Sequence, residues 1–212
     1  IQCSVQQDGT LGCWGYTGYG IQNEPTGLFA DVSVGQQHAC GLRPSGVVQC
    51  WGYNAYSLHS EPTGPFEQIE SGYNNSCAID ALGAVTCWGQ TSYSAHIAPS
   101  DAFDQVSLGY ALGCGIQSAD QGLQCWGYSG LGLHTEPTGT FVDVATGYSH
   151  ACAINTAGSL ECWGNNANGQ ATPPSGSDYV DVSAGEYHSC AIRTDGLSVC
   201  WGKDNYGQTT PL

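Results

Sequence analysis

The sequence predicts an all-β fold: a β-propeller of six repeats of about 37 residues, with one disulfide in each blade. Tryptophan recurs at intervals of 37 or 38 residues, always between a cysteine and a glycine. The segments between successive tryptophans show the two-residue alternation of strands and no helical periodicity. Six blades match the number of repeats, and a seven-bladed ring is also compatible with it. The tryptophans are Trp14, Trp51, Trp88, Trp126, Trp163 and Trp201.

All 12 cysteines follow one pattern: one precedes each repeat tryptophan, and its partner lies ten residues upstream, or eleven in the fourth repeat. This spacing fits a disulfide between adjacent strands of one blade, which implies an oxidising compartment. The alternative is a metal site, but zinc favours close pairs such as C-x2-C, two of which converge, so no metal is expected. The expected pairs are Cys3 with Cys13, Cys40 with Cys50, Cys77 with Cys87, Cys114 with Cys125, Cys152 with Cys162, and Cys190 with Cys200.

The last repeat shows how one unit is built. Residues 179–184 alternate apolar and polar side chains, as a half-buried strand does, and residues 188–192 and 197–201 form two further strands. If the two cysteines lie opposite each other, the hairpin loop contains only residues 194–196. A three-residue loop of this kind needs a left-handed residue at its end, and Gly196 stands there. The fourth repeat needs a loop that is one residue longer.

The repeats divide the chain, which is expected to form a single propeller domain over residues 1–212. Their approximate bounds are 1–28, 29–65, 66–102, 103–140, 141–178 and 179–212.

The first repeat lacks the leading strand that opens the other five. That strand could precede Ile1 in a longer chain, could come from another chain by strand addition, or the first blade could be incomplete. Strand donation from head to tail would build a filament if it does not close on itself. The five leading strands are expected to start at Phe29, Phe66, Phe103, Phe141 and Tyr179.

The charge of the chain is one-sided: 18 acidic residues face three basic ones, giving a formal net charge of −15. Binding of nucleic acid depends on lysine and arginine that neutralise phosphates, so no nucleic-acid partner is expected. No stretch approaches 18 consecutive apolar residues, so membrane insertion is not expected either.

A recurring pattern reads Val-Ser-Ala-Gly-x-x-His-x-Cys-Ala-Ile, then Asp-Gly, Cys-Trp-Gly and Asn-x-x-Gly-Gln, most fully from Val182 to Gln208 and from Val144 to Gln170. This pattern resembles the repeat of the regulator of chromosome condensation family, in a secreted form with disulfides. The resemblance implies a β-propeller, commonly seven-bladed, that acts by binding. Members of that family include a nuclear exchange factor, a secreted β-lactamase inhibitor and ectodomains of plant receptor kinases. The disulfides and the lack of a basic surface disfavour the nuclear role.

One set of histidines lies two residues before the first cysteine of a repeat: His38, His150 and His188. Asn75 and Leu112 replace them in two other repeats. A position that accepts leucine is not catalytic, so we expect these histidines to form structural hydrogen bonds between strands.

A second set lies in the loops that follow the repeat tryptophans, which are rich in tyrosine, histidine and glutamate in repeats one to four. Equivalent loops of a propeller lie on one face, so these side chains are expected to form an arc suited to a protein or a sugar. Packing between blades is the alternative interpretation. The candidate binding face comprises Tyr16, Tyr19, Tyr53, Tyr56, His59, Tyr93, His96, Tyr128 and His134.

No catalytic constellation emerges, and no cofactor is expected. Ser149 and His150 are neighbours on a strand, so their side chains point to opposite faces and do not form a nucleophile–base pair. Residues 74–76 read Asn-Asn-Ser, which makes Asn74 a candidate site of N-glycosylation.

The sequence therefore predicts a non-enzymatic structural or adhesion module that is extracellular, either secreted or on the cell surface. Its expected partner is a protein, including a second copy of itself in a filament, and a glycan is a further candidate. The alternative is a ligand-binding propeller, lectin-like or a protein-binding ectodomain, that uses the loops rich in tyrosine and histidine.

Overall fold

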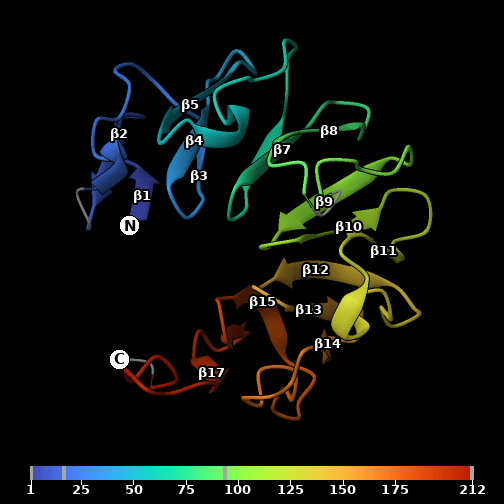
Figure 1. Ribbon diagram of the computed structural model, residues 1–212. Helices are drawn as coiled ribbons and strands as arrows, with labels where there is room; N and C mark the ends of the chain where they lie inside the picture. The colour runs from blue at the N-terminus through green and yellow to red at the C-terminus, as the bar shows by residue number, and fades with distance from the viewer. Residues whose placement is uncertain (1, 16–17, 93–94, 211–212) are drawn as a thin grey trace. The chain divides into compact units, whose positions relative to one another are not determined.

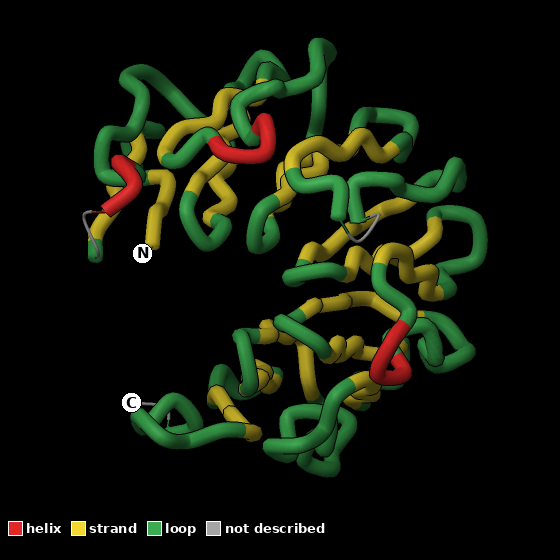
Figure 2. Tube along the Cα trace, viewed as in Figure 1, coloured by secondary structure: helices red, strands yellow, loops and turns green. Residues whose placement is uncertain are grey.

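The protein was analysed as a computed structural model, which describes residues 2–15, 18–92 and 95–210. As predicted, the fold is all-β: the described residues form seventeen strands and three short 3-10 turns. The strands make six antiparallel sheets, one for each repeat, which follow one another along the chain (Figure 1). The 3-10 turns lie in the loops that leave β2 (Leu11–Trp14), β5 (Val48–Gly52) and β11 (Leu123–Gly127), drawn red in Figure 2.

The chain divides into two compact units, and the first covers residues 1–102. It contains one two-stranded and two three-stranded sheets, so the first sheet has no leading strand among the described residues. The strands are β1 (Gln2–Val5) and β2 (Leu11–Trp14); β3 (Asp31–Val34), β4 (His38–Leu42) and β5 (Val48–Gly52); and β6 (Gln68–Ser71), β7 (Asn75–Ile79) and β8 (Val85–Gly89), with turns η1 (Gly18–Gly20) and η2 (Ala55–Ser57).

The second unit covers residues 103–212 and contains three three-stranded sheets, in each of which the middle strand comes second along the chain. The strands are β9 (Phe103–Leu108), β10 (Leu112–Gln117) and β11 (Leu123–Gly127); β12 (Phe141–Thr146), β13 (His150–Asn155) and β14 (Leu160–Gly164); and β15 (Tyr179–Ala184), β16 (His188–Arg193) and β17 (Ser198–Gly202), with turn η3 (Gly130–Gly132).

Each sheet places its two cysteines directly opposite each other, and all six predicted disulfides are present. The predicted three-residue loop of the last hairpin is also correct: Arg193 N donates to Leu197 O (2.9 Å) and Gly196 has φ +83°. The longer fourth loop closes between Gln117 and Gly122, where the left-handed residue is Gln121 (φ +59°).

The leading strands differ between the units. In the second unit they begin at the predicted aromatic residue, whereas β3 and β6 begin two residues after Phe29 and Phe66. The first part of β12 and of β15 pairs with the middle strand through a β-bulge, which extends the strand to its aromatic residue. In both units the backbone N of the leading aromatic residue donates to a carbonyl of the preceding hairpin turn: Phe29 to Gly9 O and Phe66 to Gly46 O (2.8 Å each), Phe141 to Gln121 O (2.9 Å) and Tyr179 to Gly158 O (3.1 Å).

Within each unit, successive sheets pack face to face by one rule. Because side chains alternate across a strand, the first half-cystine and the residue two positions later share a face, and that face meets the next sheet. An aromatic residue, a valine or isoleucine, an alanine and the repeat tryptophan of the next sheet pack against this face. Between the β12–β14 and β15–β17 sheets, these residues are Cys152, Ile154 and Leu160 on one side and Tyr179, Val182, Ala191 and Trp201 on the other.

Candidate interaction surfaces

Each junction between sheets within a unit is closed by the indole of the repeat tryptophan. Its Nε1 donates to a carbonyl in the preceding repeat, and that carbonyl belongs to the residue seven positions after the preceding repeat tryptophan. The side chains of these acceptor residues are themselves buried. The four bonds run from Trp51 to Ile21 O (2.7 Å), Trp88 to Leu58 O (2.9 Å), Trp163 to Leu133 O (3.1 Å) and Trp201 to Gln170 O (2.9 Å).

The loops after the tryptophans therefore pack against the next sheet, in addition to carrying the residues of the candidate binding face. The carboxylates of Glu61 and Glu136 in these loops accept bonds from the backbone N of Cys50 (2.6 Å) and Cys125 (3.3 Å). Both donors lie on the outer strand of a sheet, whose unpaired N–H groups need a partner. These glutamates thus satisfy a sheet edge within their own repeats.

The candidate binding face divides into exposed and half-buried residues. Five of its members are exposed: Tyr19, Tyr53, Tyr56, Tyr128 and His134. In the first unit the centroids of the Tyr19 and Tyr53 rings lie 5.5 Å apart. His59 and His96 are half-buried, which favours the packing interpretation for these two. Tyr16 and Tyr93 lie outside the described residues.

Three of these loops carry a large exposed side chain in left-handed backbone conformation: Tyr19 (φ +67°), Tyr56 (φ +59°) and Leu131 (φ +60°). This conformation brings the Cβ of an L-residue too close to the following carbonyl oxygen, at a cost of about 1–2 kcal/mol. Local strain of this kind clusters at sites of function. The sequence alone gave no sign of it, because neither tyrosine nor leucine favours this conformation.

Two of the three histidines before the first cysteine, His38 and His150, make the expected structural bonds between strands. His38 Nε2 bonds Ser76 Oγ and His150 Nε2 bonds Ser189 Oγ, each at 2.8 Å and each joining a sheet to the next. Burial lowers the pKa of both histidines to about 4, with a smaller contribution from a neighbouring histidine. His150 therefore pairs with a serine of the following repeat and not with Ser149.

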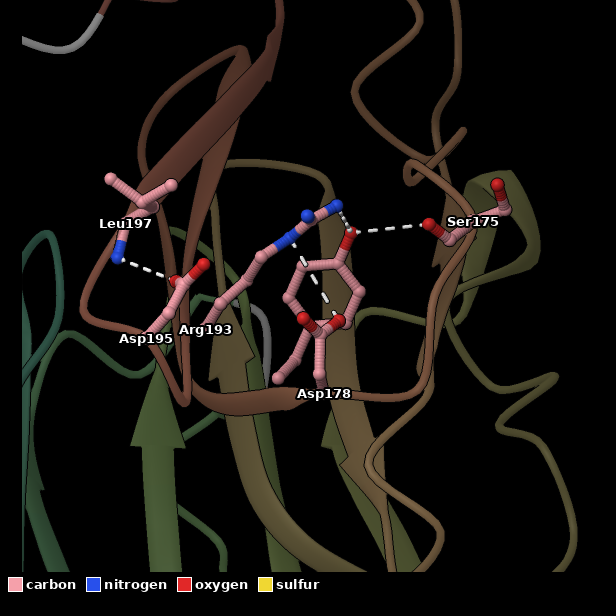
Figure 3. Close-up of polar contacts among 6 residues, drawn as sticks. Ser175, Asp178, Arg193, Asp195 and Leu197 are labelled. Carbon is pink, nitrogen blue, oxygen red and sulfur yellow. Dashed lines mark hydrogen bonds and ion pairs between the residues drawn. The ribbon is translucent and has the colours of Figure 1, made fainter.

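Arginine is used for packing in both units. The Arg193 guanidinium faces the carboxylate of Asp178 (3.8 Å), as Figure 3 shows. It also lies over the ring of Tyr179 and donates to the Tyr179 hydroxyl (3.4 Å). The Tyr179 hydroxyl in turn donates to Ser175 O (3.4 Å). In the first unit, Arg43 lies 4.4 Å from the centroid of the Phe29 ring. Both arginines thus cover an aromatic residue at the start of a leading strand or just before it.

Asn74 is largely buried, and its side-chain nitrogen donates to Gln90 Oε1 (3.2 Å). The sequon serine, Ser76, is fully buried in its bond to His38. A glycan on Asn74 would displace the bond to Gln90, so glycosylation here stays a prediction of the sequence motif.

Within residues 2–15, 18–92 and 95–210, no three His, Cys, Asp or Glu side chains gather closely enough to hold a metal ion. Over the same residues, the chain has no helix with the length and apolar character needed to cross a membrane.

Three segments match the model of the regulator of chromosome condensation (RCC1) repeat: residues 29–57, 141–170 and 179–208. Three of the six repeats of this chain are therefore similar to the RCC1 repeat. The fold class of the chain is the β-propeller, as the solved structures below indicate. Each blade contains one disulfide. No curated protein sequence matches the chain.

Two solved ectodomains of plant receptor kinases resemble this chain. The CRINKLY WD40 ectodomain of ACR4 from Arabidopsis thaliana is 29% identical, with a TM-score of 0.79 over 94% of this chain and 75% of its own. The entire ectodomain of CR4 from Physcomitrella patens is 26% identical, with a TM-score of 0.81 over 95% of this chain and 58% of its own.

Prp20p from Saccharomyces cerevisiae, whose structure was described together with its binding to Gsp1p and histones, also resembles the chain. It is 18% identical, with a TM-score of 0.70 over 84% of this chain and 58% of its own. At this identity the likeness shows the fold alone.

Proposed function

We propose that this chain is a non-enzymatic extracellular module that acts by binding protein, and that a strand from its partner completes its first sheet. The disulfides and the likeness to two ectodomains support an extracellular setting. The observation that carries the proposal is the pairing of β1. Among the described residues it pairs with β2 alone, whereas every other middle strand has a neighbour on both sides.

The other sheets define the strand that β1 would accept. In all five, the fifth residue counted from the leading aromatic lies opposite the first half-cystine, as Ser183 lies opposite Cys190. The donated strand would thus place its fifth residue opposite Cys3. The third residue of the donated strand would be one that can accept a hydrogen bond from the next sheet. In β12 this residue is Asp143, whose Oδ2 accepts from Val182 N of the next leading strand (2.8 Å). The equivalent donor in the first unit, Val32 N, bonds the carboxylate of Asp31 (2.8 Å).

A synthetic peptide of residues 177–185, Ser-Asp-Tyr-Val-Asp-Val-Ser-Ala-Gly, tests this function. We expect it to bind the chain in calorimetric titration and to slow amide hydrogen exchange within Gln2–Val5. The matched control is the same peptide with Ser183→Pro. Val182 N points to Asp143, so the N–H of Ser183 points to the other edge, and proline removes that donor. Equal binding of both peptides, or protection outside β1, would contradict strand completion.

The strained loops favour a second function, recognition of a protein or sugar ligand by the exposed Tyr19, Tyr53 and Tyr56. If the left-handed conformation serves display, Tyr56→Gly should raise stability by about 1 kcal/mol, because glycine adopts this conformation freely. Tyr206, which is 91% exposed and outside the set of left-handed residues, is the control, and Tyr206→Gly should not stabilise. Loss of stability in Tyr56→Gly, measured by chemical denaturation, would assign the loop to packing.

A further inference from the structure

The two ends of the sheets in the first unit differ in charge. His38 at the start of β4 pairs with Gly52 at the end of β5, so the turn before the middle strand and the loop after the outer strand lie at one end of the sheet. We call this the loop end of the first unit; among the described residues it comprises 18–23, 35–38, 52–60, 72–75 and 89–92. None of these residues is Asp, Glu, Lys or Arg. The hairpins at the opposite end carry Asp8, Arg43 and Asp80 instead.

The large exposed side chains of the loop end are tyrosine rings. Tyr19, Tyr53 and Tyr56 are 45–53% exposed, and no other large apolar side chain among the described residues of this end is exposed. The centroids of the Tyr19 and Tyr53 rings lie 5.5 Å apart with the ring planes at 54°, so this pair joins the loops of two successive repeats. The large exposed aliphatic side chains at or beside the hairpins of the opposite end are Leu28, Val47 and Leu82.

The backbone holds two of these rings in place. Tyr19 and Tyr56 lie in η1 and η2, red in Figure 2, in left-handed conformation. Two residues later, Ile21 and Leu58 are fully buried, and their carbonyl groups accept the indole N–H of the next repeat tryptophan. The rings are thus held outward on a buried anchor before any ligand arrives, which lowers the entropy lost on binding.

Uncharged hydrogen-bonding groups lie beside the rings. Gln36 and Asn54 are exposed. Asn54 Oδ1 accepts from His59 N (2.9 Å), and Gln37 O accepts from Tyr53 N (2.9 Å), so both segments are tied to the same loop. Side-chain amides both donate and accept hydrogen bonds, as the hydroxyl groups of a sugar do.

This combination of groups matches the chemistry of a sugar. A sugar ring has C–H groups on its faces and hydroxyl groups around its edge, and the negative face of an aromatic ring attracts C–H groups. A peptide with charged or aliphatic anchors would need charged or aliphatic groups opposite it, and the described residues of the loop end expose neither. An acidic polysaccharide would be repelled by the net charge of −15.

We propose that the loop end of the first unit binds an uncharged polysaccharide. Its sugar rings stack on Tyr19, Tyr53 and Tyr56, and its hydroxyl groups bond Gln36 and Asn54. The inference rests on the second proposed function, recognition by the strained loops, and names the class of its ligand. Because the Tyr19–Tyr53 pair joins two repeats, sugar rings along one polysaccharide chain contact successive repeats, and a longer oligosaccharide binds more tightly than a short one.

Calorimetric titration with cellohexaose, mannohexaose and chitohexaose tests the inference. We expect at least one of these uncharged hexasaccharides to bind, and the corresponding trisaccharide to bind more weakly. Tyr53→Ala and Tyr56→Ala should each lower the affinity at least tenfold, whereas Tyr53→Phe keeps the ring face and should retain most of it. Added salt should leave the affinity unchanged, because no charged group takes part. An oligomer of galacturonic acid, which is acidic, should not bind.

Two further variants separate binding from folding. Tyr206 holds the repeat position of Tyr19 and Tyr56 but lies outside the first unit, so Tyr206→Ala is the matched control and should bind as the unmodified chain does. Tyr56→Gly should be more stable than the unmodified chain and still bind the sugar at least tenfold more weakly. Chemical denaturation establishes that each variant is folded.

The outcomes distinguish this inference from the function on which it rests. No binding by any of the three hexasaccharides, or an affinity unchanged in the tyrosine variants, overturns the sugar ligand. Decaproline is the peptide probe: if it alone binds and Tyr53→Ala weakens it, the sugar class is wrong and recognition by the loops stands. Absence of all binding together with a destabilised Tyr56→Gly would refute loop recognition as well. Binding of the strand peptide at β1 is measured separately and depends on neither result.

Discussion

Two junctions in the second unit use the same repeat positions with different chemistry. Between the β9–β11 and β12–β14 sheets, Leu112 and Ala151 hold these positions, and both are buried in one apolar cluster. Between the β12–β14 and β15–β17 sheets, His150 and Ser189 hold them and form a buried hydrogen bond. The positions therefore require a matched pair rather than a histidine: two apolar groups, or two polar groups that satisfy each other.

The polar pair makes the junction sensitive to acid, and the apolar pair does not. Nδ1 of His38 and of His150 is buried without a hydrogen-bond partner among the described residues. Protonation would place a second N–H there and a charge in the junction. Because the buried junction disfavours the charged ring, the pKa of both histidines is lowered to about 4.

The largest effect should come from what the two junctions share. Trp163 closes the Leu–Ala junction and Trp201 the His–Ser junction, and both are buried and bonded to a carbonyl. Replacing either by alanine should cost about 3–5 kcal/mol in the free energy of unfolding, measured in guanidinium. Trp14→Ala, at a half-exposed site, is the control and should cost less. A large difference between the two buried tryptophans would show that the polar pair alters the apolar core.

The two junctions should contribute differently to the pH dependence of the free energy of unfolding. A histidine with a pKa of about 4 in the folded state and 6.5 in the unfolded state stabilises the fold fully above pH 6.5. This stability is lost as the pH falls from 6.5 to 4, because protons then bind the unfolded chain preferentially. The loss should approach about 3 kcal/mol for each of His38 and His150. Denaturation at a series of pH values measures it, and His150→Leu with Ser189→Ala should remove about half. An unchanged pH dependence in that double variant would refute the assignment.

A single substitution should expose the need for a matched pair. Ser189→Ala leaves the His150 imidazole buried without its partner and should destabilise by about 1–3 kcal/mol at neutral pH. Adding His150→Leu recreates the pair that Leu112 and Ala151 form, and should recover most of the loss. Thermal unfolding of the two variants at one pH makes the comparison. If the double variant is less stable than the single one, the two junctions differ in shape as well as in polarity.

The elements within a repeat could be predicted from sequence because they depend on nearby residues. Cysteine spacing fixed the register of each hairpin, and Gly196 predicted the turn between β16 and β17. The start of the leading strands was less predictable. Phe29 and Phe141 occupy equivalent positions, yet only Phe141 lies in a strand, because a bulge continues its pairing.

Partners across junctions were missed, although a signal for them was present. His38 lies two residues before the first cysteine of its repeat, and its partner Ser76 lies one residue before the first cysteine of the next repeat. Leu112 and Ala151 stand in the same two positions, so the sequence pairs histidine with serine and leucine with alanine. The candidate binding face was predicted as one class of residues. Local conformation and packing divide it, since Tyr56 is held outward while His59 lies half-buried.

The sequence by itself determined the repeat, the six disulfides, the all-β character and the acidity, because each follows from the order or kinds of residues within about forty positions. Only the tertiary structure decided which tryptophans are covered and which carbonyls they bond, since both depend on sheets from successive repeats meeting face to face. Trp14 and Trp201 share the same sequence signature, and the difference between them is one of neighbours: Trp201 packs on the preceding sheet and bonds Gln170, whereas Trp14 stands half-exposed and bonds its own Gln2.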